Sequence, residues 1–143
     1  MLDGATNAVA SVDTREIPCA VAVDAAANKV YVANYGSDSV TVIDGARNAV
    51  IATVKVGSHP QAIAVNSATH MVFVANTHSN NVTVIDGTNN SIAATVDSGR
   101  SPYAISIDEA NNKAYVASIA ADGLVVIDGS TLKAAPASGF AGR

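Results

Sequence analysis

A repeat of 42 residues constrains this chain more than any other feature of its sequence. The segment KVYVANYGSDSVTVIDG at residues 29–45 returns as MVFVANTHSNNVTVIDG at 71–87 and as KAYVASIAADGLVVIDG at 113–129. Prolines 18, 60 and 102 follow the same period. Internal periods of this size are typical of architectures in which one supersecondary unit is copied and stacked. The fold must therefore be built from copies of this unit.

Each repeat predicts four short antiparallel strands. After the proline, small and large apolar residues alternate with period two, as in AVAVD at 20–24, AIAVN at 62–66 and AISID at 104–108, and this alternation is a strand signal. The second and third strands lie within the repeated segment, and a fourth, AVIATVKV at 49–56, follows the Asp-Gly pair. Apolar residues do not recur at helical spacing, and Val, Ile and Thr dominate. We expect an all-β chain.

Both faces of each predicted sheet are apolar. Tyr31 and Ala33 lie on one face of the second strand, and Val30 and Val32 lie on the other. A sheet with one face in water would show a polar residue at every second position. Sheets that stack face to face around an axis cover both faces, which is the β-propeller arrangement. The chain has no tryptophan for a WD40 signature, and ankyrin and HEAT units are helical.

Composition excludes several classes of function. Hydrophobic residues make up 49% of the chain and charged residues 14%, with a net charge of -4. This balance excludes a disordered tail and disfavours nucleic acid as a partner, because no basic surface offsets phosphate repulsion. No apolar run is long enough to span a bilayer. The opening MLDGATNAVA lacks the basic and apolar regions of a signal peptide, so we expect none in this chain.

Three residue types that could carry chemistry have simpler explanations. Cys19 is the only cysteine, and we expect a small buried residue beside Pro18 rather than a nucleophile. An aspartate precedes a glycine in every repeat, so these carboxylates are expected to serve turns in which the glycine takes a positive φ. His70 falls in the loop between the first and second strands, and we interpret it as structural. The aspartates are Asp3, Asp44, Asp86 and Asp128, and the glycines are Gly4, Gly45, Gly87 and Gly129.

The motifs Y/F-V-A-N and V-I-D-G at fixed spacing resemble those of the YVTN family of β-propeller repeats. The resemblance covers residues 2–128, and the third copy departs most from it, with Ser118 in place of Asn76 and IAADG in place of THSNN. It implies a propeller of a type found in surface-layer and secreted proteins, hence a secreted, periplasmic or cell-surface location. Members carry six or seven blades and range from adhesion proteins to lyases and quinoprotein-like enzymes. The resemblance therefore implies the fold and leaves the function open.

Counting strands predicts three blade equivalents in permuted register. Residues 1–17 match the end of a third strand and a fourth strand at Asn7–Asp13, and no convincing strand follows Asp128. We therefore predict propeller repeats over residues 1–133, with seams near 18, 60 and 102, and a flexible tail at 134–143. Because propellers close with about four to eight blades, we expect a homodimer that forms a six-bladed ring. In that dimer, Asn7–Asp13 of each chain would pair beside Leu124–Asp128 of its partner.

Candidate site residues lie in the loops before the first strand and between the second and third strands. These loops share one rim of a propeller, and they are where the copies differ most in chemistry. Rigid scaffolds often carry function on such loops. The histidines could relay protons or ligate zinc, but no metal-binding spacing supports this, and we predict no metal and no cofactor. The ligand-binding candidates are Tyr35, His59, His78, Arg100 and Tyr103.

Three hypotheses for function follow. The leading one is a non-enzymatic binding module whose rim loops and central channel contact a protein, a glycan or a small ligand. The second is a propeller enzyme, a lyase or hydrolase, with His59 or His78 as a base or metal ligand and Arg100 holding an anion. The third is a fragment of a longer surface-layer or secreted propeller.

Overall fold

The computed structural model describes residues 14–119 and 124–136, and there the chain is all β, which confirms the predicted fold class. Within these residues no helix is long and apolar enough to cross a bilayer. The strands are β1 (Pro18–Asp24), β2 (Lys29–Asn34), β3 (Ser39–Asp44), β4 (Ala49–Lys55), β5 (Pro60–Asn66), β6 (Met71–Asn76), β7 (Asn81–Asp86), β8 (Ser91–Asp97), β9 (Pro102–Asp108), β10 (Lys113–Ser118), β11 (Leu124–Asp128) and β12 (Lys133–Pro136).

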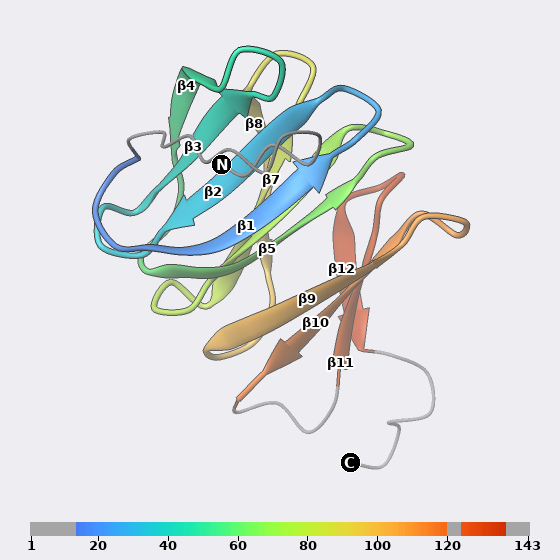
Figure 1. The fold of residues 1–143 in the computed structure, drawn as a ribbon. Coiled ribbons are helices and arrows are strands. Elements are labelled where there is room, and N and C mark those ends of the chain that lie inside the picture. The colour runs from blue at the N-terminus through green and yellow to red at the C-terminus, as the bar shows by residue number, and fades with distance from the viewer. Residues whose placement is uncertain (1–13, 120–123, 137–143) are drawn as a thin grey trace.

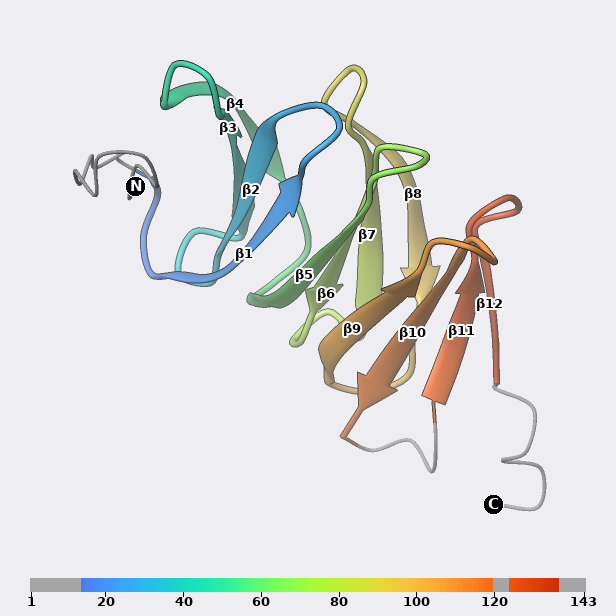
Figure 2. The same cartoon turned by 45° about the vertical axis from the view of Figure 1, so that its right-hand side comes forward.

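The strands form three four-stranded antiparallel sheets, which we call blades 1, 2 and 3. Their orders are β1-β2-β3-β4, β5-β6-β7-β8 and β9-β10-β11-β12. Figures 1 and 2 show the sheets stacked face to face, with β1, β5 and β9 side by side along the inner edge. This arrangement is that of adjacent propeller blades. Each blade begins at the proline that marks the repeat.

The hydrophobic core lies between the blades. In the first seam, between blades 1 and 2, Tyr31, Val40 and Val42 pack against Val72, Val74 and Ile85. In the second seam, between blades 2 and 3, the residues 42 positions later meet in the same way: Phe73, Val82 and Val84 pack against Ala114, Val116 and Ile127. All twelve side chains are at most 1% exposed. One interface is therefore used twice, which explains why both faces of each sheet are apolar.

The aspartates before the glycines serve turns, as predicted. In each repeat the carboxylate accepts a hydrogen bond from the backbone N–H two residues ahead, at 2.9 Å for Asp44, 3.0 Å for Asp86 and 2.9 Å for Asp128. Hydrogen bonds to the ionised form hold the pKa of each of these carboxyls below its usual value. These carboxylates are therefore committed to local structure. Asp3 lies outside the described residues.

The positive φ predicted for the glycines after these aspartates is wrong. The left-handed position of each turn falls on Asn48, Asn90 or Leu132, with φ of 51°, 58° and 56°. Glycine is required for a different reason, a close approach. A Cβ on Gly87 would lie 2.6 Å from both the carbonyl oxygen of His70 and the hydroxyl oxygen of Tyr31. Any side chain at this position must therefore displace the backbone of the neighbouring loop.

Blade 3 has a fourth strand of its own. The prediction that no strand follows Asp128 is therefore wrong for residues 133–136. β12 pairs with β11 in antiparallel register, with Ala134 opposite Ile127. The free edge of β11 offers unpaired backbone groups that β12 satisfies. The place beside Leu124–Asp128 that was predicted for a partner's N-terminal strand is therefore filled by the same chain. The predicted strand Asn7–Asp13 and residues 137–143 lie outside the described residues.

Cys19 is exposed rather than buried, contrary to prediction. Cys19 is the second residue of strand β1. Gln61 and Tyr103, which occupy the same position in blades 2 and 3, are exposed as well. This position is therefore exposed in every repeat. The thiol donates a hydrogen bond to the carbonyl oxygen of Pro60 at 3.2 Å. Partial burial against blade 2 raises the pKa of the Cys19 thiol, which disfavours the reactive thiolate.

Candidate functional site

Two kinds of connection meet at one rim of the blades, as the sequence predicts. The loop between the second and third strands bonds to the segment that precedes the first strand of the same blade. In blade 2, the N–H groups of Thr77 and His78 donate to the carbonyl oxygens of His59 and Ser58 at 3.1 and 3.2 Å. In blade 1, the N–H of Tyr35 donates to the carbonyl oxygen of Ile17 at 2.8 Å. We call this edge the upper rim.

Three aromatic side chains gather on the upper rim at the first seam. The rings of Tyr35 and His59 lie 4.5 Å apart between centroids and 68° apart in orientation. His59 and His78 lie 3.9 Å apart at 44°, and Tyr35 and His78 lie 6.4 Å apart. The structure thus brings together three of the five predicted site residues, from blade 1, the connection and blade 2. We call Tyr35, His59 and His78 the rim cluster.

His59 is the centre of the rim cluster. Its backbone has a φ of 55°, and its N–H donates to a carboxylate oxygen of Asp38 at 2.9 Å. This bond crosses from blade 2 to blade 1 and fixes the imidazole beside Tyr35. Nδ1 of His59 is buried and has no hydrogen-bond partner among the described residues. A buried imidazole nitrogen without a partner is costly, so the cluster is not a fully satisfied polar network.

The second seam shows that the upper rim does not need these rings. Forty-two residues after Tyr35 and His59 stand Thr77 and Ser101. The N–H of Ser101, with a φ of 53°, donates to the side chain of Asn80 at 3.1 Å, as His59 does to Asp38. Thr77 donates its hydroxyl to the carbonyl oxygen of Pro102 at 2.8 Å. The backbone has the same arrangement at the second seam with small side chains at these positions. The fold therefore does not require the rings of the rim cluster.

Arg100 and Tyr103 lie one blade further along, around the start of β9. Arg100 is exposed, and the side chain of Tyr103 is 46% exposed. Among the described residues, no hydrogen bond, ion pair or ring contact joins either residue to the rim cluster. Within the same residues, no group of three or more His, Cys, Asp and Glu side chains could hold a metal ion. The side chains of the rim cluster are two imidazoles and a phenol.

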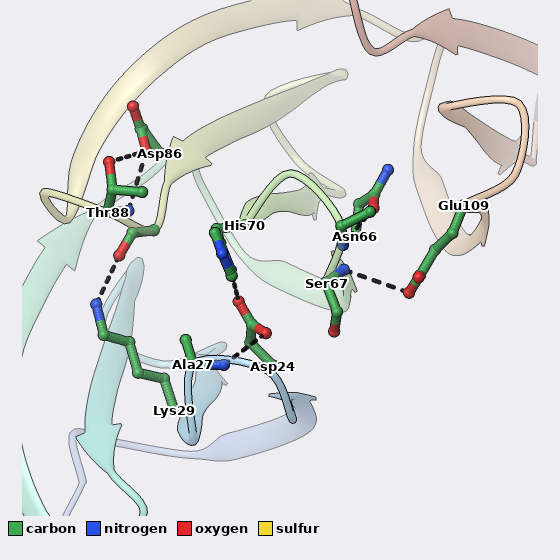
Figure 3. A network of polar contacts seen from close by, with 11 residues as sticks. Asp24, Ala27, Lys29, Asn66, Ser67, His70, Asp86, Thr88 and Glu109 are labelled. Carbon is green, nitrogen blue, oxygen red and sulfur yellow. Dashed lines mark hydrogen bonds and ion pairs between the residues drawn. The ribbon is translucent and has the colours of Figure 1, made fainter.

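Polar contacts also cross the seams at the opposite edge, which we call the lower rim (Figure 3). At the first seam, Asp24 and Nδ1 of His70 lie 2.6 Å apart. At the second seam, Asn66 donates to Asn112 at 3.1 Å. Both pairs join positions 46 residues apart, so the repeat places the same contact at each seam. The sequence shows these polar residues at the repeat period. Which of them pair across a seam could not be identified without knowing how neighbouring blades are aligned.

The Asp24–His70 pair is the more strongly polar of the two. The Asp24 side chain is fully covered and that of His70 is 34% exposed. Burial alone would raise the pKa of Asp24, but hydrogen bonds from His70 and from the N–H of Ala27 outweigh it, and the pKa lies below its usual value. Lys29 adds a second bond across this seam, from Nζ to the carbonyl oxygen of Gly87 at 2.6 Å. His70 thus has the structural position that the sequence predicts.

Three solved structures with similar folds come from chains much longer than this one. Hydrazine synthase of Kuenenia stuttgartiensis matches 90% of it with a TM-score of 0.80 and 23% identity. U3-55K matches 81% (TM-score 0.68, 12% identity), and apo AztD from Citrobacter koseri matches 75% (TM-score 0.63, 18% identity). The chain spans 37%, 35% and 30% of those proteins. At these identities the likeness shows the fold alone.

Sequence comparison identifies a family. No curated protein sequence matches the chain, but the family model described as "Lactonase, 7-bladed beta-propeller" matches residues 11–107. This segment is more than half of the chain and includes blades 1 and 2. The narrower resemblance to YVTN repeats, and the surface-layer type that it implies, stay predictions. The chain belongs to the lactonase seven-bladed β-propeller family.

Proposed function

We propose that the chain is a non-enzymatic binding module whose ligand contacts the rim cluster. The observation that carries the proposal is the contrast between the two seams. Tyr35, His59 and His78 form a ring cluster where the next repeat closes with Thr77 and Ser101. A feature that the fold does not need, placed on loops of a rigid scaffold, is typical of a binding site.

The chemistry of the rim cluster favours a ligand with a flat or ring-shaped polar group. Tyrosine and histidine each present an apolar ring face and a polar tip. A sugar ring, a small heterocyclic ligand or a planar side chain of another protein would stack on such faces and bond to the tips. The buried Nδ1 of His59 adds a hydrogen-bonding group that lacks a partner among the described residues.

The three histidines of the chain provide a direct test of this proposal. His59 and His78 belong to the rim cluster, whereas His70 lies on the lower rim and serves as an internal control. Maltotriose and imidazole-4-carboxylate serve as probes of a sugar ring and of a planar ring. We expect either probe to shift the NMR signals of the His59 and His78 imidazoles and to leave those of His70 unchanged. Equal shifts at all three, or none with either probe, would contradict the proposal.

A second candidate is hydrolysis of a lactone, favoured by the family to which the chain belongs. In this case His59 or His78 would act as the general base toward water, and Arg100 would hold an anionic group of the substrate. Release of acid from glucono-δ-lactone, followed at constant pH, tests it. Hydrolysis above the uncatalysed rate that is lost in His59→Gln and His78→Gln would favour the enzyme. Perturbation of the two imidazoles by the lactone without acid release would favour the binding module.

A further inference from the structure

The sequence contains the acceptor motif for N-linked glycosylation twice. In this motif, Asn-x-Ser/Thr with x other than proline, the asparagine receives the glycan. It occurs as Asn81-Val82-Thr83 and as Asn89-Asn90-Ser91. A transferase must reach both the asparagine amide and the hydroxyl two residues later, so the surroundings of each motif decide whether it can be modified. The structure places the two motifs in opposite environments.

The first motif is locked into blade 2. Asn81 lies in β7 and pairs on one side with Asn76 and on the other with Asp97. Its side-chain oxygen accepts a hydrogen bond from Nδ2 of Asn76 at 3.0 Å, and the hydroxyl of Thr83 accepts one from the same amide at 2.8 Å. Thr83 is 2% exposed. In the folded chain, this motif is therefore closed to a transferase.

The second motif lies on the turn between β7 and β8, at the lower rim. Asn89 and Ser91 are both exposed. Oδ1 of Asn89 accepts hydrogen bonds from the backbone N–H and the hydroxyl of Ser91, at 3.2 and 2.6 Å. Among the described residues, Nδ2 of Asn89 donates no hydrogen bond. The nitrogen that would carry the glycan is thus free, and the hydroxyl that the motif requires lies beside it.

The turn belongs to the repeat, but the motif does not. Asp86 accepts a hydrogen bond from the N–H two residues ahead, as the equivalent aspartates do in the other blades. Other residues occupy the positions of Asn89 and Ser91 in those blades, so neither is needed to form the turn. These residues are Arg47 and Ala49 in blade 1 and Thr131 and Lys133 in blade 3.

We propose that Asn89 is an acceptor for an N-linked glycan. The donor is an oligosaccharide joined to a lipid pyrophosphate, used by an oligosaccharyltransferase. Nδ2 of Asn89 forms a bond to C1 of the first sugar as the bond from C1 to the pyrophosphate oxygen breaks. The lipid pyrophosphate leaves, and one amide proton passes to a base of the transferase. The glycan would project from the lower rim, opposite the rim cluster, so the proposal does not depend on the proposed binding function.

A transfer assay on the folded chain tests the proposal. The chain is incubated with a purified oligosaccharyltransferase that requires only Asn-x-Ser/Thr and with its lipid-linked oligosaccharide. We expect mass spectrometry to find one glycan per chain, at Asn89. Peptides of residues 77–85 and 86–94 are the controls, and we expect both to be modified, because neither is held by the fold. Ser91→Ala should abolish modification of the chain, and Ser91→Thr should retain it.

Three results would overturn the proposal. The first is a folded chain without glycan, whether or not the peptide of residues 86–94 is modified. The second is a glycan at Asn81 of the folded chain, because the structure closes that motif. The third is undiminished modification of Ser91→Ala, which would show that the transfer does not use this motif.

Moving the motif to blade 1 tests the reason for the proposal. Arg47→Asn combined with Ala49→Ser creates the same motif around Asn48, on the equivalent turn. The side chain of Arg47 is 70% exposed, and its ion pair with Asp44 is local to the turn, so we expect the variant to fold. We expect two glycans per chain. A folded variant, verified by circular dichroism, that still carries one glycan would contradict the claim that this exposed turn makes the motif accessible.

Discussion

The first and second seams are the same interface built with different polar residues. Their apolar cores match position by position, and all the residues at the centre are at most 1% exposed. At the lower rim, however, the first seam has a carboxylate and an imidazole where the second has two amides. At the upper rim, rings stand where the second seam has a threonine and a serine.

This comparison separates what the fold requires from what this chain adds. The apolar positions and the turn residues recur because every blade must bury two faces and reverse direction three times. The polar positions at the rims are free to change, provided that each buried group finds a partner. Differences between the seams therefore identify where charge, pH dependence and binding can be specific to one part of the molecule.

The largest difference is expected when one partner of each lower-rim pair is removed. His70→Ala leaves the fully covered carboxylate of Asp24 without its main partner, and we expect a loss of about 1.5–3 kcal/mol in the free energy of unfolding. Asn112→Ala removes a neutral partner and should cost about 0.5–1.5 kcal/mol. Urea denaturation of both variants measures the contrast. Equal losses would show that the charge at the first seam adds nothing.

The close approach at Gly87 predicts a loss of similar size. Gly87→Val forces a side chain against the carbonyl oxygen of His70 and the hydroxyl of Tyr31, and we expect a loss of about 1–3 kcal/mol, as for overpacking. Ala46→Val, at an exposed turn position with room for a side chain, should leave thermal unfolding unchanged. If Gly87→Val melts with the parent, the packing of this turn is not as described.

Acid should weaken the first seam more than the second. The folded-state pKa of Asp24 lies below its usual value, so its contribution to stability is present above the pKa of the unfolded chain, about 3.9. It is lost as the pH falls through the folded-state pKa. Between pH 5 and pH 3, the parent should therefore lose more stability than Asp24→Asn. Other carboxyls titrate in both proteins, so parallel acid profiles would rule out this role for Asp24.

A smaller seam effect concerns one hydroxyl. Tyr31 is 0% exposed, and its hydroxyl has no hydrogen-bond partner in the described residues, whereas the equivalent residue in blade 2 is Phe73. We expect Tyr31→Phe to change the free energy of unfolding by less than about 1 kcal/mol, in the stabilising direction. Clear destabilisation in thermal unfolding would indicate that the hydroxyl is bonded.

The same hydroxyl predicts a difference in alkali. Burial, with Asp24 and Asp86 nearby, raises the pKa of Tyr31 to about 12. The unfolded chain binds this proton more weakly, with a pKa of about 10. Stability from this group is therefore present below pH 10 and is lost as the pH rises toward 12. Tyr31→Phe should lose less stability than the parent over this interval.

Most of the fold could be predicted from the period, because strands, turns and seams repeat with it. The errors arose where a residue's role depends on its neighbours in space. Glycine after Asp86 looked like a turn residue, but Asn90 holds the positive φ, and the glycine is needed because the loop at His70 passes close by. Residues 133–136 carry little strand signal of their own, and the edge of β11 recruits them.

The site could be predicted only in part, for a related reason. Rim loops are recognisable from the repeat, so Tyr35, His59 and His78 could be named as candidates. Which of them meet depends on the crossing of two blades, and this brings Tyr35 and His59 together across the first seam while Arg100 and Tyr103 remain a blade away. The covered carboxylate of Asp24 could not be found, because an aspartate at a strand end looks like any turn residue.

The central claim is that the fold does not need the rim cluster, and one double variant tests it most directly. Tyr35→Thr with His59→Ser gives the first seam the residues that the second seam has at these positions, including a serine that tolerates positive φ there. We expect urea denaturation to give a free energy of unfolding within about 0.5 kcal/mol of the parent. A loss of about 1.5 kcal/mol or more, the scale of aromatic packing, would contradict the claim and make the cluster part of the core.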